Sequence, residues 1–413
     1  MILKELTKEE FNKFTNKNNS SLYQTLSYAE VMNKQKYECL FYGLLDNNII
    51  YGASLILVKK IHGFKYAFAP RGLICDYSNR ILIKDFTDLL KKELSKRNIV
   101  ALRISPSIIK SINILGKKEE NNQYNKIFEN LKNCGFNHLG YGESFDGIKS
   151  RFEAIINLND KPNNLFKKIS KNFKTKIRSA DNNGIMIFKG NEENLDTLFI
   201  QTKNKYPRDL KYFKDIYYHF NQNNNIEIFY SKLNTSEYVK NIQYKYQRQM
   251  VLCNNANDLV FKNVKKNNQK NIKRKLAEES KLESIKNELI YATKLLKNYP
   301  DGIITASVLI IKNKKEVFML MDGYDKTYKR LNSKHLLLWK LIEKYSKEGF
   351  KTFNLGGIGN FNIKNSKYQG LNDFKLSFGA TAIEYAGDFE LIIKKALYIM
   401  YKNSSSVLGI LKK

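Results

Sequence analysis

The chain contains one sequence pattern twice. Residues 44–57 and residues 299–310 each place a turn at an aspartate before a short apolar strand, and small residues interrupt each strand. The aspartates are Asp46 and Asp301, and the small residues read Gly-Ala-Ser in the first copy and Thr-Ala-Ser in the second. A unit that occurs twice predicts two domains of one kind, with a cleft between them where a ligand can bind.

The elements predicted after these strands also come in the same order. Each copy continues with a strand, a helix and a second strand. The expected ranges are 65–69, 83–96 and 99–104 in the first copy, and 316–321, 333–347 and 352–355 in the second. This agreement in order favours a duplication over the alternative, a chance similarity between short apolar strands.

We therefore expect an α/β protein with two domains and an inserted arm. A chain of 413 residues with 42% hydrophobic residues can form two cores. The first domain is expected at 1–150, where 113–130 reads as a surface excursion. The second domain is expected at 151–234 and 298–388, and 389–413 as a helix that packs on the first domain or, alternatively, lies on a membrane.

Residues 235–297 are predicted to form a helical hairpin. They contain no Pro or Gly, and apolar residues recur at intervals of three and four on either side of a polar turn. Because this segment interrupts the second copy, it should project from the body as an arm. Basic residues gather near its expected tip, which suits contact with RNA or another phosphate-rich surface: Lys262, Lys265, Lys266, Lys270, Lys273, Arg274 and Lys275.

The charge of the chain predicts an anionic partner. Lys and Arg number 71 and Asp and Glu number 40, which gives a formal net charge of +31. Residues 161–180 hold seven basic residues and no acid, with apolar residues spaced as on one amphipathic helix. RNA, an anionic membrane surface or a phosphorylated substrate would each be attracted by such a field; solubility combined with codon bias is the alternative.

Motifs for metals and common cofactors are not found. The cysteines, at positions 39, 75, 134 and 253, form no C-x-x-C pair, and the four histidines lie in separate elements. No G-x-S-x-G, Walker A or dinucleotide fingerprint occurs, and the loop 328–334 lacks the glycines of an acetyl-CoA site. We also expect no signal peptide and no membrane-spanning helix. The sequence thus predicts neither a metal nor a cofactor, while acyl transfer from another donor stays open.

Five motifs, in order, resemble those of the Fem/MurM-type peptidoglycan bridge aminoacyltransferases. They are Phe68-Ala-Pro-Arg-Gly72, the basic helix 170–180, Asn354-Leu-Gly-Gly-Ile358, the run 370–379 with its Phe-Lys and Phe-Gly pairs, and Tyr385-Ala-Gly-Asp-Phe389. The resemblance spans nearly the whole chain. It implies tandem acetyltransferase-like (GNAT-like) domains with an antiparallel coiled-coil arm inserted in the second.

The resemblance also implies an activity and partners. The donor would be an aminoacyl-tRNA, and the acceptor an amine on the stem peptide of a peptidoglycan precursor, in its lipid-linked or nucleotide form. The enzyme would build the interpeptide bridge in the cytoplasm, at the inner face of the cell membrane. Both substrates are polyanions, so they account for the charge, and the arm residues Lys265, Lys266, Lys270, Lys273 and Arg274 would contact tRNA.

Site residues follow from the matched motifs. The resemblance places Lys375 and Phe374 at the reacting carbonyl, although Phe374 also fits a plain core position. Arg208 and Tyr212 would bind the precursor's phosphates, with a surface ion pair as the alternative for Arg208. The remaining substrate-binding candidates are Arg71, Lys36 and Lys34, of which the two lysines are equal candidates for one N-terminal position.

Departures from the family pattern leave other functions open. Ser105-Pro106 stands where relatives often carry Asp-Pro, so no catalytic acid is expected there, and residues 318–321 lack the usual tyrosines. The alternatives are an N-acyltransferase that uses another acyl donor, and a non-catalytic adaptor that binds RNA or membrane. The sequence does not indicate the amino acid transferred, its position in the bridge or the oligomeric state.

Overall fold

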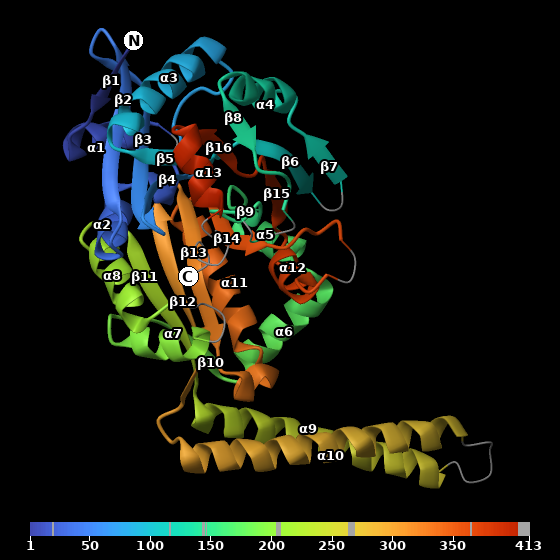
Figure 1. The fold of residues 1–413 in the computed structure, drawn as a ribbon. Coiled ribbons are helices and arrows are strands. Elements are labelled where there is room, and N and C mark those ends of the chain that lie inside the picture. Colours follow the sequence, from blue (N-terminus) through green and yellow to red (C-terminus); the bar gives the residue numbers. More distant parts are fainter. Residues whose placement is uncertain are drawn as a thin grey trace.

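The computed structural model describes residues 1–18, 20–114, 117–142, 145, 147–203, 208–262, 269–363 and 366–403. Two mixed sheets form the body, and a pair of long helices projects from it (Figure 1). Within the described residues, no helix is both long and apolar enough to cross a bilayer.

The first sheet has seven strands and is built mainly from the N-terminal third of the chain. Its spatial order is β1 (Ile2–Glu5), β2 (Glu38–Asp46), β3 (Ile49–Ile61), β4 (Phe64–Pro70), β5 (Ile99–Ser105), β16 (Phe389–Ile392) and β8 (Phe136–His138). Only β4 and β5 pair in parallel. The associated helices are α1 (Lys8–Lys17), η1 (Leu22–Gln24), α2 (Leu26–Lys34), α3 (Arg80–Lys96), α4 (Tyr124–Asn133) and α13 (Lys395–Asn403).

The second sheet has nine strands. Its order is β10 (Ile185–Lys189), β11 (Ile226–Leu233), β12 (Ile303–Asn313), β13 (Glu316–Tyr324), β14 (Thr352–Ile358), β9 (Phe152–Asn157), β15 (Thr381–Tyr385), β6 (Ile109–Ile114) and β7 (Lys117–Glu120). Its helices are α5 (Pro162–Lys168), α6 (Lys171–Asn182), α7 (Asn194–Thr202), α8 (Leu210–Asn221), η2 (Lys326–Leu331), α11 (Ser333–Lys347) and α12 (Gln369–Leu376).

The duplicated unit is confirmed in both sheets. In the first, the hairpin β3–β4 is followed by α3 and by β5, which runs parallel to β4. In the second, the hairpin β12–β13 is followed by α11 and by β14, which runs parallel to β13. A crossover helix between parallel strands next to an antiparallel hairpin is the arrangement expected for an acetyltransferase-like α/β fold, and the fold class is therefore as predicted.

Two segments belong to a different sheet from the one expected from their position in the sequence. The hairpin β6–β7 lies within the range expected for the first domain and overlaps the start of the predicted surface excursion 113–130, but it extends the second sheet through β15. Conversely, β16 follows the second copy and pairs with β5 in the first sheet. The two domains therefore exchange strands, and α13, which continues from β16, packs its Tyr401 against Tyr66 of the first sheet.

The basic segment 161–180 is two helices, so the prediction of one helix was wrong. The backbone of Ile169 is extended (ψ 141°) and ends α5, and the backbone N–H of Ser170 donates to the carbonyl of Ser377 at 2.9 Å. The apolar spacing persists across this break because Leu165, Phe173 and Ile177 face one core. Periodicity alone could not detect the two extended residues, Ile169 and Ser170, between the helices.

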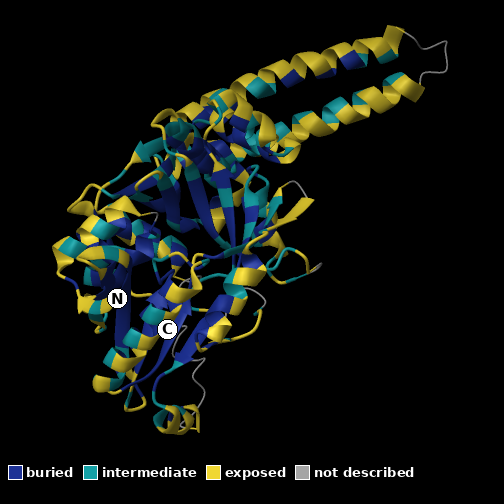
Figure 2. Ribbon diagram, turned by 90° about the horizontal axis from the view of Figure 1, so that it is seen from above, coloured by how far each residue is buried: buried dark blue, intermediate teal, exposed yellow. Residues whose placement is uncertain are grey.

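The faces of β13 separate two cores. Val317 and Met319 lie in a cluster with α11 residues such as Leu337, whereas Phe318 packs with Tyr23 of the first domain. Figure 2 shows the strands of the body buried and most of the arm exposed. The second sheet is thus covered by helices on one face and by the first domain on part of the other.

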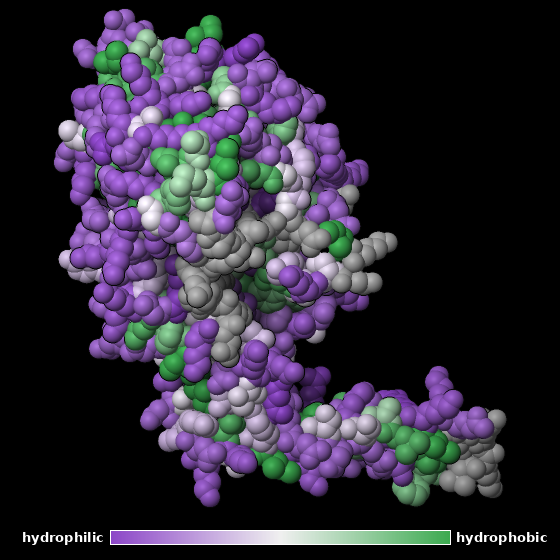
Figure 3. All heavy atoms as spheres, viewed as in Figure 1, coloured by the Kyte–Doolittle hydropathy of each residue, from purple (hydrophilic) through white to green (hydrophobic). Residues whose placement is uncertain are grey.

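The arm consists of α9 (Thr235–Lys262) and α10 (Gln269–Asn298), which pack against each other in antiparallel directions (Figure 1). The helical hairpin is therefore where it was expected; its coiled-coil character stays a prediction. Figure 3 shows hydrophobic atoms gathered toward the distal end of the arm on an otherwise mostly hydrophilic face.

Candidate active site

The parallel strands β13 and β14 pair at one end only. Their register runs from Glu316 opposite Thr352 to Phe318 opposite Asn354 and then stops, although both strands continue. In the first copy, β4 and β5 stay paired from Lys65 opposite Ile99 to Pro70 opposite Ser105. The second sheet therefore opens between two adjacent parallel strands, and the first does not.

A lysine from α12 reaches this opening. Lys375 is 7% exposed, and its Nζ donates to the carbonyl oxygen of Gly357 at 2.8 Å. A methyl group built on Gly356 would lie 3.6 Å from Lys375 Nζ and 3.9 Å from the ring of Phe318. Lys375 thus approaches the opening from the helix side while Phe318 borders it from the side of the first domain.

A cavity of about 460 Å³ lies on the helix side of the sheet. Its walls include Phe374, His335 and three lysines, Lys176, Lys329 and Lys334. Lys334 forms an ion pair with the buried carboxylate of Asp322, and its Nζ lies 4.2 Å from the centre of the Phe374 ring. This helix-side cavity is therefore basic and has an aromatic wall next to Lys375.

His335 stays neutral at physiological pH. Its ring packs between Phe173 and Phe374, with ring centroids at 4.6 and 5.3 Å. Burial, together with the charge of Lys176, lowers the pKa of His335 to about 4. Its Nδ1 is buried and has no hydrogen-bond partner within the described part of the chain. The cavity therefore offers a neutral nitrogen that can accept a hydrogen bond from a ligand.

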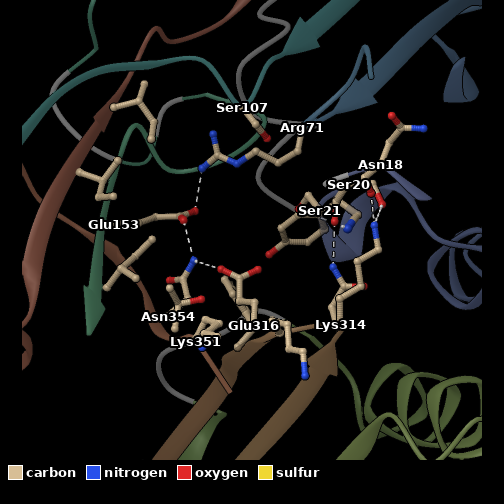
Figure 4. Close-up of a pocket in the computed structure, with 18 of the residues that line it drawn as sticks. Asn18, Ser20, Ser21, Arg71, Ser107, Glu153, Lys314, Glu316, Lys351 and Asn354 are labelled. Atoms are coloured by element: carbon tan, nitrogen blue, oxygen red, sulfur yellow. Dashed lines mark hydrogen bonds and ion pairs between the residues drawn. The ribbon is translucent and has the colours of Figure 1, made fainter. Parts of the chain in front are cut away.

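A second cavity, of about 640 Å³, lies between the two domains on the opposite face. The second sheet contributes Phe318, Ile155 and Ile383, and the first domain contributes Tyr23 and the segment before it. Figure 4 shows Arg71, Glu153, Asn354 and Glu316 pointing toward one another at the inner end of this interdomain cavity. Phe318 belongs to its wall, so this cavity reaches the same opening that Lys375 reaches from the other face.

A buried ion pair organises the inner end of the interdomain cavity. Arg71 donates to Glu153 at 2.6 Å and to the carbonyl of Ser150 at 2.9 Å, and its guanidinium lies 3.8 Å from the centre of the Tyr385 ring. Asn354 Nδ2 donates to Glu153 at 2.9 Å. Both charged side chains are at most 5% exposed. Burial opposes the charge of Glu153, but Arg71 and these hydrogen bonds outweigh it and lower the pKa of the carboxyl.

Glu316 is the second carboxylate in this group. Among the described residues, its carboxylate accepts a hydrogen bond from Asn354 Nδ2 at 3.3 Å and forms no ion pair. Burial and the negative charge of Glu153 raise its pKa to about 7, against the smaller effects of Asn354 and Arg71. The inner end of the cavity therefore holds two carboxylates and one guanidinium.

The segment that begins at Arg208 brings a second cationic group to the first domain. The guanidinium of Arg208 lies 4.5 Å from the centre of the Tyr212 ring, and its charge acts on the hydroxyls of Tyr28 and Tyr37. Lys149 lies nearby, with Nζ 3.4 Å from the centre of the Tyr23 ring. Burial, with the charges of Arg71 and Arg208, lowers the pKa of Lys149 to about 7.

The predicted site residues therefore fall into three places. Phe374 lines the helix-side cavity, its neighbour Lys375 reaches the opening beside it, and Arg208 lies beside Tyr212; the roles expected of these residues stay predictions. Lys34 and Lys36 are both exposed at the end of α2, which packs on α8, so the choice between them stays open. Arg71 lines the interdomain cavity, where its guanidinium is already bound to Glu153.

The predicted tRNA contacts are only partly described. Lys270, Lys273 and Arg274 are exposed at the start of α10, whereas Lys265 and Lys266 lie outside the described residues. Among the described residues, no group of three or more His, Cys, Asp or Glu side chains could hold a metal ion.

The chain was then compared with known proteins. A family model described as the FemAB family matches residues 6–405. The chain belongs to the FemAB family. Aminoacyltransferase FemA of Staphylococcus epidermidis is 25% identical over 416 residues, which cover 97% of this chain and 98% of the relative. FemA of Staphylococcus aureus is 25% identical over 429 residues, covering 97% of each chain.

Comparison with solved structures supports the same FemAB fold. A crystal structure of FemX superposes with a TM-score of 0.74 at 21% identity, covering 97% of this chain and 99% of that chain. At this level of identity the match concerns the fold alone. The predicted family resemblance is confirmed, and so, at the level of the family and its named relatives, is the expectation of an aminoacyltransferase.

Several residues of this FemAB site were not singled out from the sequence. Lys149, Glu153, Glu316 and His335 come from four separate elements, and no local motif marks them. The one usable signal was Glu153, an acid inside an otherwise apolar strand (Phe-Glu-Ala-Ile-Ile), since a buried acid requires a partner.

Proposed function

We propose that this protein transfers an amino acid from aminoacyl-tRNA to a stem-peptide amine of a lipid-linked peptidoglycan precursor. One observation carries the proposal: the second sheet opens between β13 and β14, the interdomain cavity reaches this opening at Phe318, and Lys375, the neighbour of Phe374 in the wall of the helix-side cavity, reaches it from the other face. A donor on one face and an acceptor on the other can then meet at Lys375.

The helix-side cavity suits the acylated end of a tRNA. Lys176 and Lys329 supply positive charge for phosphates, whereas Lys334 is paired with Asp322, and Phe374 and His335 offer aromatic surfaces on which a base can stack. The exposed Lys270, Lys273 and Arg274 of the arm would contact the tRNA farther from its acylated end. Such contacts give affinity that falls steeply with salt concentration.

The acceptor would bind along the first domain. Arg208 and Lys149 place two cations beside several tyrosine hydroxyls, which is a suitable environment for the precursor's phosphates. From there the stem peptide would pass Tyr23 into the interdomain cavity. A precursor anchored in lipid would bring the basic protein to the inner face of the membrane, where anionic lipids attract it further.

The chemistry requires little beyond positioning. An aminoacyl ester is already activated, so an amine that attacks its carbonyl forms a tetrahedral oxyanion, and the ribose hydroxyl then leaves. Lys375 places an ammonium group where that oxyanion would develop, and the two cavities hold the reactants in contact.

The test is a transfer assay with purified protein, lipid-linked precursor and a mixture of charged tRNAs, read by mass spectrometry. We expect the precursor to gain the mass of an amino acid residue. Lys375→Met should lower the turnover number by about 10²–10³-fold, the usual cost of losing one group that stabilises an oxyanion. Lys84→Met, on the exposed face of α3, is the matched control. Wild-type protein that binds both substrates without transfer would overturn the proposal.

A further inference from the structure

We propose that Glu316 receives the primary ammonium group of the acceptor and takes its proton before the amine attacks. This assignment rests on the proposed function and adds to it a residue and an entry route: the acceptor's amine-bearing side chain enters through the interdomain cavity. Neither the family match nor the named relatives identifies Glu316.

The charges at the inner end of the cavity leave room for one cation. Arg71 and Glu153 neutralise each other at 2.6 Å, whereas the side chain of Glu316 has, among the described residues, only the amide of Asn354 as a hydrogen-bond partner. Together the three groups carry one uncompensated negative charge when Glu316 is ionised. An alkylammonium placed against Glu316 would balance it, and its aliphatic chain would lie along Ile109, Ile155, Ile383 and Phe318.

The position of Glu316 links this charge to the reaction. Glu316 and Phe318 project from the same face of β13, and Phe318 borders the opening that Lys375 reaches from the other face. An amine released at Glu316 therefore needs to move only past Phe318 to meet an ester beside Lys375. Two other groups near the opening are less suited to act as the base: Glu153 is bound to Arg71, and His335 lies on the other face with its pKa lowered to about 4. The end of β5 and the segment after it contribute Ser105 and Ser107, which carry no basic group.

The outer rim of the cavity is basic. Lys17, Lys315 and Lys351 are exposed there, and Lys314 donates to the carbonyls of Thr15 and Asn18. A ligand with an ammonium at its inner end and carboxylates at its outer end would fit this distribution of charge. A stem peptide with a basic side chain and free carboxylates has that character.

The acceptor's ammonium gives one proton to the carboxylate of Glu316 and becomes a neutral amine. The amine nitrogen forms a bond to the ester carbonyl carbon, the carbon–oxygen bond to the ribose breaks, and the second amine proton passes to the ribose oxygen. The products are an amide and a free ribose hydroxyl, and Glu316 returns its proton to solvent.

The test is the pH profile of transfer by Glu316→Gln, with Glu316→Asp as the conservative variant and Glu119→Gln, on the exposed β7, as the control. At pH 7 we expect Glu316→Gln to lower turnover by about 10²-fold, within the range for loss of a general base. Its rate should then rise about tenfold per pH unit up to pH 9, as more acceptor amine is neutral in solution, while the wild-type rate levels off above pH 7. Glu316→Asp should regain part of the activity and the plateau.

The charged and titratable groups that face Glu316 stay in place in these variants, so each contributes equally to the compared profiles: Glu153, Arg71, Tyr385, Tyr23, Lys314, Lys315, Lys351 and Lys17.

Equal turnover and identical pH profiles for wild type and Glu316→Gln would overturn the assignment while leaving the transfer activity intact. Absence of transfer by the wild type would instead contradict the proposed function. A parallel fall in activity at every pH would indicate a structural role and also reject the assignment.

Discussion

The buried pair Arg71–Glu153 allows a quantitative test of how the interdomain cavity is held together. We expect the two single substitutions to be unequal in cost. Arg71→Met removes the only guanidinium among the described residues of the inner group and leaves two carboxylates, Glu153 and Glu316, without a counter-charge. Glu153→Gln leaves Arg71 with the Ser150 carbonyl, the Tyr385 ring and the nearby Glu316.

The magnitudes follow from these partners. Removing one member of a buried pair costs about 3–5 kcal/mol, and Arg71→Met should lie at the upper end because it also loses the Ser150 hydrogen bond. Glu153→Gln should cost about 1–2 kcal/mol, because Glu316 can take over as the counter-charge and the amide can still accept from Asn354. The double variant should lose about 2 kcal/mol less unfolding free energy than the sum of the losses in the two single variants. The reason is that neither residue of the pair is then left as an unpaired buried charge.

Trp339 makes the measurement direct. It is the chain's one tryptophan, and it packs on Phe166 at 4.8 Å in the core on the helix side of the second sheet, the sheet whose strand β9 carries Glu153 on its other face. Its fluorescence during urea unfolding reports the midpoint for each variant, and an unchanged slope would show that the same unit unfolds. The reasoning would be refuted by Glu153→Gln costing more than Arg71→Met, or by both costing under about 1 kcal/mol.

Three further predictions concern charge. The affinity for the precursor should fall as pH rises through about 7, because Lys149 loses its charge there. Lys149→Met should lower the affinity at pH 6 by about 10–100-fold and make the affinity less dependent on pH, as measured by calorimetry. Glu316 keeps its proton up to about pH 7 in the folded state but loses it near pH 4.5 in the unfolded state. The free energy of unfolding of the wild type should therefore fall by up to about 3 kcal/mol between pH 4.5 and 7, whereas that of Glu316→Gln should not show this fall, as measured by urea midpoints. Replacing Lys270, Lys273 and Arg274 by Ser should weaken tRNA binding and reduce the slope of log affinity against log salt by about 2–3, as measured by filter binding.

Much of the fold could be predicted because its signals are local. The strand, helix and strand of each copy are set by apolar periodicity, and the predicted helix 333–347 coincides with α11. The arm was predictable for the same reason, since two long runs of helical spacing flank a polar turn. The exchange of β6–β7 and β16 between the sheets was not, because strand pairing depends on partners that lie more than two hundred residues away.

The candidate site likewise contains residues that local motifs predict and residues that they do not. Lys375 and Arg208 stand in short motifs, whereas the residues around them come from distant segments. Glu316 follows a hairpin turn whose sequence, Asn-Lys-Lys-Glu, is that of an ordinary surface loop. Only the packing of the first domain against the second sheet covers that position and raises the pKa of its carboxyl. A surface acid and a buried acid are therefore indistinguishable in the sequence until the domain interface is known.

The two copies show how one fold can serve different purposes. In the first copy β4 and β5 remain paired to their ends, so its sheet offers no gap between parallel strands. In the second, pairing stops after Phe318, and Gly356, with φ +77°, keeps side-chain carbon out of the gap where Lys375 and Phe318 approach each other. The first domain instead covers the open face of the second sheet and supplies Arg71, Tyr23 and Lys149. The duplication therefore provides the proposed reaction site with one copy and part of the wall of the interdomain cavity with the other.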